Sequence, residues 1–175
     1  MTLQNLTFVL GGAASGKSAF AEKLCIESGK NRIYLATCQP YDAEIKTKIS
    51  KHIAQRGDGW TTIEEPMNIA PIFSKFSQGD VVLLDCATLW ISNLLLAEAD
   101  LSQNSKELLT SLSTCKASVV VVSNEVGGGI VPENALARKF RDAQGMLNQQ
   151  IAAQSDLAVQ VVAGLPVVLK GQLPT

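Results

Sequence analysis

One short segment constrains the fold of this chain more than any other. Residues 11–18 read Gly11-Gly12-Ala13-Ala14-Ser15-Gly16-Lys17-Ser18, which fits the pattern G-x-x-x-x-G-K-[ST]. This segment directly follows an apolar stretch, residues 6–10, and precedes residues 18–28, which have helical spacing. A glycine-rich turn between a buried strand and a helix directs backbone N–H groups toward an anion. The order therefore predicts an α/β fold with a phosphate-binding loop after its first strand.

Strand-like and helix-like segments alternate along the rest of the chain. Continuous apolar runs, typical of strands buried on both faces of a parallel sheet, occur at residues 6–10, 33–36, 81–85, 119–122 and 158–163. Helical spacing occurs at residues 18–28, 43–55 and 133–153. We therefore expect an α/β fold of the P-loop NTPase (RecA-like) class, with helices flanking a mostly parallel sheet.

Two further segments depart from this alternation. Residues 161–169 read as two strands around a tight turn, which predicts a closing antiparallel C-terminal hairpin. The polar stretch at residues 97–106 is expected to be a surface connection. Because no linker or repeat interrupts the chain, we expect residues 1–175 to form a single nucleotide-binding domain.

Composition excludes several classes of function. Fifteen Lys and Arg residues face 16 Asp and Glu residues, a formal net charge of −1 that is low for a nucleic-acid-binding protein. The mean hydropathy of +0.16 argues against a disordered chain. No apolar stretch approaches the roughly 20 residues that span a bilayer, and the first residues lack a signal-peptide pattern. With four scattered cysteines and no C-x-x-C pair, we expect a reduced, cytoplasmic protein without nucleic-acid or membrane partners.

Within the loop, each residue type has a physical task. Gly11 and Gly16 allow the backbone to turn and approach phosphate oxygens. Lys17 supplies positive charge between the β- and γ-phosphates, and the Ser18 hydroxyl completes a Mg²⁺ shell. The expected nucleotide contacts in this loop are Gly11, Gly12, Ala13, Ala14, Ser15, Gly16, Lys17 and Ser18.

A second acid is needed to complete a magnesium site of this kind. Asp85 ends the apolar run 81–84 and so has the position of a Walker B carboxylate, the second expected Mg²⁺ ligand beside Ser18. An aspartate at a strand end also caps turns, a role that Thr88 could share. Given the loop, we favour the metal role.

The chain has one histidine, His52, with Lys51 and Arg56 close by in sequence. An exposed helical histidine beside basic residues is usually a solvated side chain. Cationic neighbours also lower the pKa of an imidazole, which would keep the ring neutral and nucleophilic toward phosphorus. Both interpretations stay open from these residues alone.

Aromatic residues, cysteines and one further loop complete the candidates. Trp60 and Trp90 are expected to be core or interface anchors, and the cysteines to be small buried apolar residues. Gly127, Gly128 and Gly129 follow a predicted strand and predict a loop where α/β proteins bind ligands. The same loop could be a plain strand-to-helix turn, with Pro132 starting the helix.

Six blocks occur in a single order over nearly the whole chain. They are Gly11-Gly12-Ala13-Ala14-Ser15-Gly16-Lys17-Ser18, Tyr34-Leu35-Ala36-Thr37-Cys38, Ile49-x-x-His52, Trp60-x-x-x-Glu64, Leu84-Asp85-Cys86-x-Thr88-Leu89-Trp90-x-Ser92-Asn93-Leu94-Leu95, and Ser123-Asn124-Glu125-Val126-Gly127-x-Gly129-Ile130-Val131-Pro132. Together they resemble the bifunctional adenosylcobinamide kinase / adenosylcobinamide-phosphate guanylyltransferase family of cobalamin biosynthesis.

The resemblance implies two reactions with Mg²⁺ and with ATP and GTP as substrates. Adenosylcobinamide is phosphorylated by ATP or GTP, and GTP then donates GMP to a histidine, here His52. Pyrophosphate leaves as the histidine takes GMP, and adenosylcobinamide phosphate then takes up this GMP to give adenosylcobinamide-GDP. The catalytic residues would be His52 and Lys17. Beyond the loop, the resemblance implies nucleotide contacts at Ala36, Thr37, Cys38, Ile53, Ala54, Gln55, Arg56, Glu64 and Asp85.

The resemblance also implies a homotrimer. From the position of the glycine-rich loop at the carboxyl end of the predicted sheet, Glu125 and Asn134 are candidate contacts to the corrinoid or to another subunit. Three features depart from the family pattern: Ala14 replaces the usual Arg, Cys38 replaces the usual Ser, and residues 57–59 replace a proline-containing stretch. We expect these changes to affect nucleotide affinity and the balance of the two activities. The alternatives are a P-loop kinase of another small metabolite and a nucleotide-binding regulatory protein.

Overall fold

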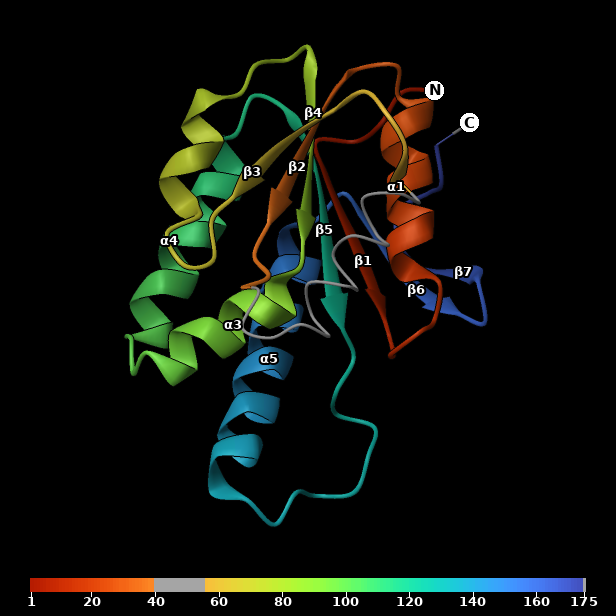
Figure 1. Cartoon of the computed structure of the whole chain (residues 1–175). Coiled ribbons are helices and arrows are strands. Elements are labelled where there is room, and N and C mark those ends of the chain that lie inside the picture. Colours follow the sequence, from red (N-terminus) through yellow and green to blue (C-terminus); the bar gives the residue numbers. More distant parts are fainter. Residues whose placement is uncertain (40–55, 175) are drawn as a thin grey trace.

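The computed structural model describes residues 1–39 and 56–174, and the predicted helix at residues 43–55 lies outside them (Figure 1). The described residues form one seven-stranded sheet in the order β3-β2-β4-β5-β1-β6-β7. The strands are β1 Leu6–Gly11, β2 Asn31–Ala36, β3 Trp60–Glu64, β4 Asp80–Asp85, β5 Ser118–Asn124, β6 Leu157–Val162 and β7 Leu165–Lys170. All neighbouring pairs are parallel except β6 and β7, which confirms the mostly parallel sheet and the closing hairpin.

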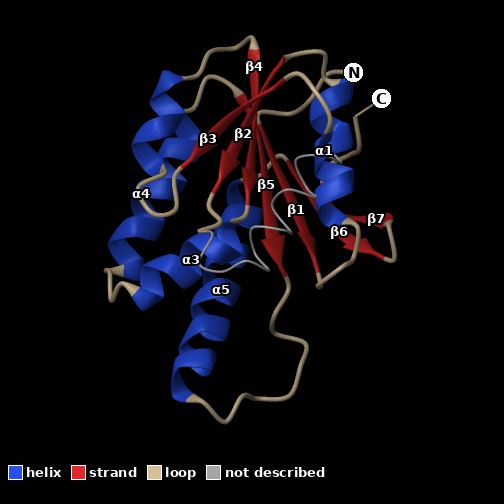
Figure 2. Cartoon of the chain, in the orientation of Figure 1, coloured by secondary structure: helices blue, strands red, loops and turns tan. Residues whose placement is uncertain are grey.

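Helices cover both faces of this sheet (Figure 2). Helix α1, Lys17–Glu27, lies on one face, and the other face carries α3, Ala87–Leu96, α4, Leu101–Thr114, and α5, Ala135–Gln154. A short 3-10 helix, η1, spans Ala70–Lys75. None of the described helices is both long enough and apolar enough to cross a membrane.

The central strands are apolar on both faces, as their uninterrupted sequences predict. In β5, Val119 and Val121 pack into the core beneath α3, α4 and α5, whereas Val120 and Val122 pack beneath α1. All four valines are fully buried, and each such burial contributes about 1.5–3 kcal/mol. The two apolar layers therefore hold the carboxyl ends of the strands in place.

The expected surface connection at residues 97–106 is wrong for its second half, because α4 begins at Leu101. Asp100 caps this helix, since its Oδ1 accepts a hydrogen bond from the Gln103 N–H at 3.0 Å. Leu108 and Leu112 are the buried positions of α4, whereas its other faces are polar. A solvated amphipathic helix was thus mistaken for a loop because its first turn is almost wholly polar.

The start of α5 also differs from the expectation that Pro132 begins a helix. Asn134 is the N-cap of α5, and its Oδ1 accepts a hydrogen bond from the Ala137 N–H at 3.1 Å. Pro132 lies before the cap, where its carbonyl accepts a hydrogen bond from Arg138 Nη1 at 2.9 Å. The cap amide therefore sets the helix boundary.

Candidate active site

The predicted phosphate loop lies at the carboxyl edge of the sheet, where the parallel strands end together. Gly11, the last residue of β1, pairs with Asn124 of β5 on one side and with Val161 of β6 on the other. Along the same edge, Ala36 of β2 pairs with Asp85 and with Glu64. Ligands of open α/β sheets bind at this edge, so the strand topology brings the loop and three predicted contacts to one side of the molecule.

The loop has the backbone shape that its glycines predict. Gly16 has a φ of 91°, and a Cβ there would lie 3.0 Å from the Cα of Gly164. A Cβ on Gly11 would lie 2.8 Å from the carbonyl oxygen of Val161. Gly164 N donates to Ser15 O at 2.8 Å, which joins the loop to the C-terminal hairpin. Glycine is therefore required at both positions by close backbone packing and, at Gly16, also by the left-handed conformation.

Lys17 and Ser18 open α1 directly after the loop. Lys17 Nζ donates to the Gly12 carbonyl at 3.1 Å, so its ammonium lies over the loop. No side chain among the described residues caps the N-terminus of α1. Its backbone N–H groups and the Lys17 ammonium together make this end of the helix suited to phosphate oxygens.

Asp85 lies on the sheet face that α1 covers. Val81 and Leu83 of β4 pack in the α1-side core, and the alternation of side chains puts Asp85 on that same face. Tyr34 Oη donates to Asp85 Oδ2 at 2.9 Å. Burial, and then the neighbouring carboxylate, raise the pKa of Tyr34, which keeps the phenol protonated as a donor.

The donor chemistry of this face fits the expected magnesium ion. The Asp85 carboxylate and the Ser18 hydroxyl are hard oxygen donors of the kind that Mg²⁺ prefers. Mg²⁺ usually takes only one or two protein ligands and completes its shell with waters and substrate phosphates. Two oxygen donors beside a phosphate loop therefore suffice.

Tyr34→Phe should separate the hydrogen bond to Asp85 from ring packing. The Phe ring keeps the edge-on contact with Trp60, whose ring centroid lies 6.1 Å away. The loss of one hydrogen bond to a carboxylate should lower the rate of phosphoryl transfer from the nucleotide at limiting Mg²⁺ roughly tenfold. It should also raise the Mg²⁺ concentration that gives the half-maximal rate. Initial rates across a Mg²⁺ titration measure this, and an unchanged Mg²⁺ dependence would show that Tyr34 does not orient Asp85.

The segment at the end of β2, Ala36, Thr37 and Cys38, reaches the same edge, and the side chain of Thr37 forms hydrogen bonds within the protein. The Thr37 hydroxyl donates to Cys86 O at 2.8 Å and accepts from Cys86 N at 2.9 Å. Asn93 Nδ2 donates to Thr37 O at 2.8 Å. Thr37 therefore ties this segment to the end of β4, and Ala36 and Cys38 remain half-buried.

Arg56 and Glu64 flank the site on the β3 side. The Arg56 side chain is 7% exposed, and its guanidinium lies 3.5 Å from the Tyr34 ring centroid. Arg56 Nη2 also donates to Thr62 Oγ1 at 3.1 Å. Arg56 is thus stacked beside the aromatic ring that contacts Asp85, and Glu64 is exposed at the end of β3. Four other predicted residues lie outside the described part: His52, Ile53, Ala54 and Gln55.

A buried polar network beneath the end of β5 was missed by the sequence reasoning. Ser123 Oγ donates to Asn148 Oδ1 at 2.7 Å, and Gln144 Nε2 donates to Ser123 Oγ at 2.8 Å. Asn148 Nδ2 donates to Asn124 O at 3.1 Å, and Asn124 N donates to Thr88 Oγ1 at 2.7 Å. The available signal was the i, i+4 pair Gln144 and Asn148 on the apolar face of a predicted helix.

The glycine-rich loop between β5 and α5 extends beyond the carboxyl edge of the sheet (Figure 1). Glu125 N donates to Gly11 O at 3.0 Å, and its carboxylate accepts from Gly127 N. Ile130 is 96% exposed. The loop therefore begins against the phosphate loop and reaches into solvent, while Asn134 uses its amide oxygen as the α5 cap.

The remaining aromatic and cysteine predictions are confirmed in part. Trp90 is 1% exposed, and its Nε1 donates to Met67 O at 2.7 Å. Trp60 is half-buried. Cys25 and Cys86 are buried, and burial raises the pKa of the Cys86 thiol to about 12. The other two cysteines, Cys38 and Cys115, are only half-buried.

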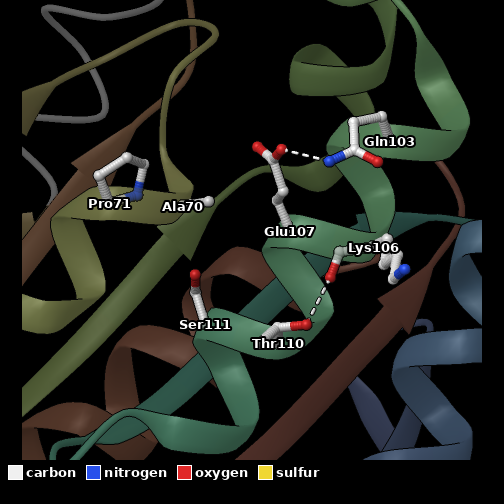
Figure 3. Close-up of a pocket in the computed structure, with 7 residues that line it drawn as sticks. All are labelled: Ala70, Pro71, Gln103, Lys106, Glu107, Thr110 and Ser111. Carbon is white, nitrogen blue, oxygen red and sulfur yellow. Dashed lines mark hydrogen bonds between the residues drawn. The ribbon is translucent and has the colours of Figure 1, made fainter.

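A surface groove on another part of the molecule contains no predicted site residue (Figure 3). It lies between η1 and α4, where Gln103 Nε2 donates to Glu107 Oε1 at 2.6 Å. Its lining residues are Ala70, Pro71, Gln103, Lys106, Glu107, Thr110 and Ser111. The carboxyl edge of the sheet, with the phosphate loop and the Asp85 carboxylate, is therefore the candidate active site.

Comparison with solved structures shows the fold class. A structure of the RadB recombinase superposes with a TM-score of 0.51 at 17% identity, covering 90% of this chain and 74% of that one. A protein of Pyrococcus horikoshii OT3 gives a TM-score of 0.60 at 8% identity, covering 99% and 89%. These likenesses confirm a RecA-like α/β fold.

Comparison of sequences is more specific. The bifunctional adenosylcobalamin biosynthesis protein CobP of Pseudomonas aeruginosa is 42% identical over 167 residues, which cover 94% of this chain and 96% of that protein. The bifunctional adenosylcobalamin biosynthesis protein CobU of Escherichia coli is 37% identical over 181 residues, covering 94% and 99%. The model of the family described as cobinamide kinase / cobinamide phosphate guanyltransferase, CobU, matches residues 7–169. The chain belongs to the cobinamide kinase / cobinamide phosphate guanyltransferase family.

Proposed function

We propose that this protein phosphorylates adenosylcobinamide with ATP or GTP and then transfers GMP from GTP to adenosylcobinamide phosphate. The products of the second reaction are adenosylcobinamide-GDP and pyrophosphate. One observation supports the proposal beyond family membership. The phosphate loop follows β1 and Asp85 ends β4, so both lie at the carboxyl edge of the parallel strands, and Asp85 is on the sheet face that α1 covers. Nucleotide phosphates, an ammonium and a carboxylate can therefore meet there.

The phosphate loop binds the triphosphate in this proposal. Backbone N–H groups of residues 11–16 and of the first turn of α1 donate to phosphate oxygens, and Lys17 neutralises charge between the β- and γ-phosphates. Ser18 and Asp85 hold Mg²⁺, with Tyr34 orienting the carboxylate through its 2.9 Å hydrogen bond. When bound, Mg²⁺ supplies further positive charge to the phosphate oxygens.

His52 is the proposed carrier of GMP. A ring nitrogen attacks the α-phosphorus of GTP, a P–N bond forms, and the bond to the pyrophosphate oxygen breaks. A phosphate oxygen of adenosylcobinamide phosphate then attacks the same phosphorus and the P–N bond breaks. Contacts to the guanine nucleotide are proposed at Ala36, Thr37, Cys38, Ile53, Ala54, Gln55, Arg56, Glu64 and Asp85. For Thr37 the contact falls to the second lone pair of its carbonyl oxygen, since its hydroxyl is paired with Cys86 and its N–H donates to Asp85 O.

The test follows both phosphate groups separately. With Mg²⁺, adenosylcobinamide and γ-labelled ATP, we expect label in adenosylcobinamide phosphate. With α-labelled GTP alone, we expect acid-labile, base-stable label on the protein, which unlabelled adenosylcobinamide phosphate then removes as adenosylcobinamide-GDP. If α-labelled GTP gave labelled adenosylcobinamide-GDP but never labelled the protein, the histidine route would be contradicted. Absence of both adenosylcobinamide phosphate and adenosylcobinamide-GDP would contradict the proposed function.

We also infer a single domain over residues 1–175, a homotrimer and a cytoplasmic location. Strands from Leu6 to Lys170 share one sheet, which supports the single domain. Four free cysteines support a reducing compartment. The C-terminal hairpin exposes Val162 at the end of β6 and Leu165, Val167, Val168 and Leu169 of β7, an apolar edge of the kind that subunit contacts cover. Light scattering should give three times the 18.6 kDa chain mass, and a monomer mass would contradict the trimer.

A further inference from the structure

Asn124 lies at the carboxyl edge of the sheet, and the proposed function assigns it no role. It is the last residue of β5, which lies between β1 and β4 in the sheet. Asn124 pairs with Gly11, where the phosphate loop begins, and Asp85 pairs with Val122 two residues earlier on the same strand. Along the carboxyl edge, Asn124 therefore lies between the phosphate loop and the carboxylate.

The side chain of Asn124 belongs to the face that α1 covers. Val120 and Val122 pack in the core that contains Ala21 and Leu24 of α1, and side chains alternate along a strand. Asn124 thus shares a face with Asp85 and with the start of α1. Ser123 points to the opposite face, into the polar network of α5.

The backbone of Asn124 is held from three sides. Its N–H donates to Thr88 Oγ1 at 2.7 Å, and its carbonyl accepts from Asn148 Nδ2 at 3.1 Å. The next residue, Glu125, donates through its N–H to Gly11 O at 3.0 Å. Helices α3 and α5 and the phosphate loop therefore position this one residue.

The side-chain oxygen of Asn124 contrasts with this well-held backbone. Oδ1 is buried and has no hydrogen-bond partner within the described part of the chain. Buried polar atoms are nearly always paired, so an unpaired acceptor in such a held position points to a ligand that supplies a donor. Phosphate oxygens of a nucleoside triphosphate are acceptors and cannot supply it, whereas a hydroxyl group can.

We propose that Asn124 is a substrate-positioning residue of the kinase step, in which Oδ1 accepts a hydrogen bond from the hydroxyl group that is phosphorylated. This inference rests on the proposed kinase reaction. The hydroxyl oxygen forms a bond to the γ-phosphorus as the bond to the bridging oxygen breaks, the nucleoside diphosphate leaves, and the proton passes to water. The Asn124 amide orients the attacking oxygen and takes up no proton, and Thr88 and Asn148 position Asn124.

Three variants test the role. Asn124→Leu has similar size and no acceptor, so we expect kcat/KM for adenosylcobinamide to fall about 100-fold, as misplacement of a reacting atom can cause. Asn124→Asp keeps an acceptor of the same shape and should retain more kinase activity than the Leu variant. Asn104→Leu, on α4, is the matched control: its side-chain amide donates to Asp100 O at 2.8 Å, away from the phosphate loop, and activity should be unchanged.

The second reaction supplies an internal control. Labelling of the protein by α-labelled GTP needs no cobinamide hydroxyl, so Asn124→Leu should label as the wild type does and bind a nonhydrolysable triphosphate within about twofold of its Kd. Normal phosphorylation by a folded Asn124→Leu protein would overturn the inference alone. Equal losses in labelling, triphosphate binding and phosphorylation would also overturn it, since they indicate a structural role. If wild-type protein phosphorylates no cobinamide, the proposed function fails instead.

Discussion

Lys17→Ala is expected to lower kcat/KM of both reactions by about a thousandfold, the range that removal of a preorganised charge at phosphoryl transfer produces. In the structure the Lys17 ammonium lies over the phosphate loop, where Nζ donates a hydrogen bond to Gly12 O at 3.1 Å. In the kinase step it stabilises charge on the transferred phosphoryl group and the leaving diphosphate. In the GMP transfer it stabilises the leaving pyrophosphate, so one substitution should impair both reactions.

The same helix offers a matched control for this prediction. Lys23 lies on α1, its side chain is 70% exposed, and it forms an i, i+4 ion pair with Glu27 at 3.7 Å. Such exposed pairs contribute little, so Lys23→Ala should keep normal rates and stability. Steady-state kinetics of both reactions, with thermal unfolding as a folding check, make the comparison. A folded Lys17→Ala protein with normal rates would exclude the loop as the site of phosphate binding.

His52→Ala is expected to abolish the labelling of the protein by α-labelled GTP and to lower GMP transfer by a factor on the order of a thousand or more. Alanine has no nitrogen that can form the P–N bond to GMP, so the two-step transfer through the protein is lost. His52 is the chain's only histidine, so no second imidazole can take over. Phosphorylation of adenosylcobinamide should continue at about the wild-type rate, because that step transfers the γ-phosphoryl group directly.

Comparing the two losses separates nucleotide binding from covalent transfer. Lys17→Ala should impair both reactions, whereas His52→Ala should impair only the second. Autoradiography after alkaline gel electrophoresis measures the label, and product chromatography measures both cobinamide products. Label retained on His52→Ala would place the GMP on another residue, and loss of phosphorylation as well would mean that His52 also serves the kinase step.

The parts of the fold that could be predicted were those whose sequence is shaped by burial. Strand β4 and strand β5 are uninterrupted apolar runs because both faces of each strand are covered. The phosphate loop was predicted because close backbone packing and a positive φ require glycine at set positions. Strand β3, Trp60–Glu64, was missed because an outer strand is largely exposed and its residues alternate little in hydropathy. Helix α3, whose sequence ATLWISNLLL is apolar nearly all round, has little amphipathic pattern to recognise.

The candidate site likewise contains residues that could be predicted from the sequence and residues that could not. The residues of the phosphate loop and Asp85 could be predicted as candidates from sequence because the chemistry of phosphate and Mg²⁺ binding favours their types and spacing. The network of Ser123, Gln144 and Asn148 was missed because each is an ordinary polar residue in its own segment. Apart from the i, i+4 pair of Gln144 and Asn148, their hydrogen bonds join residues up to 25 positions apart, and such pairs leave no local sequence pattern.

The sequence by itself thus determined the α/β class, the phosphate loop, the strand-end acid and the sole histidine, because each depends on local geometry or on the chemistry of one residue type. Only the tertiary structure decided that Tyr34 holds Asp85, that the Thr37 hydroxyl is used within the protein, and that Asn124 lies between the loop and the acid. Those relations depend on strand order and register, which long-range packing sets. A sheet in which β5 separates β1 from β4 places Asn124 between the phosphate loop and Asp85, and no neighbouring residue in the chain specifies that order.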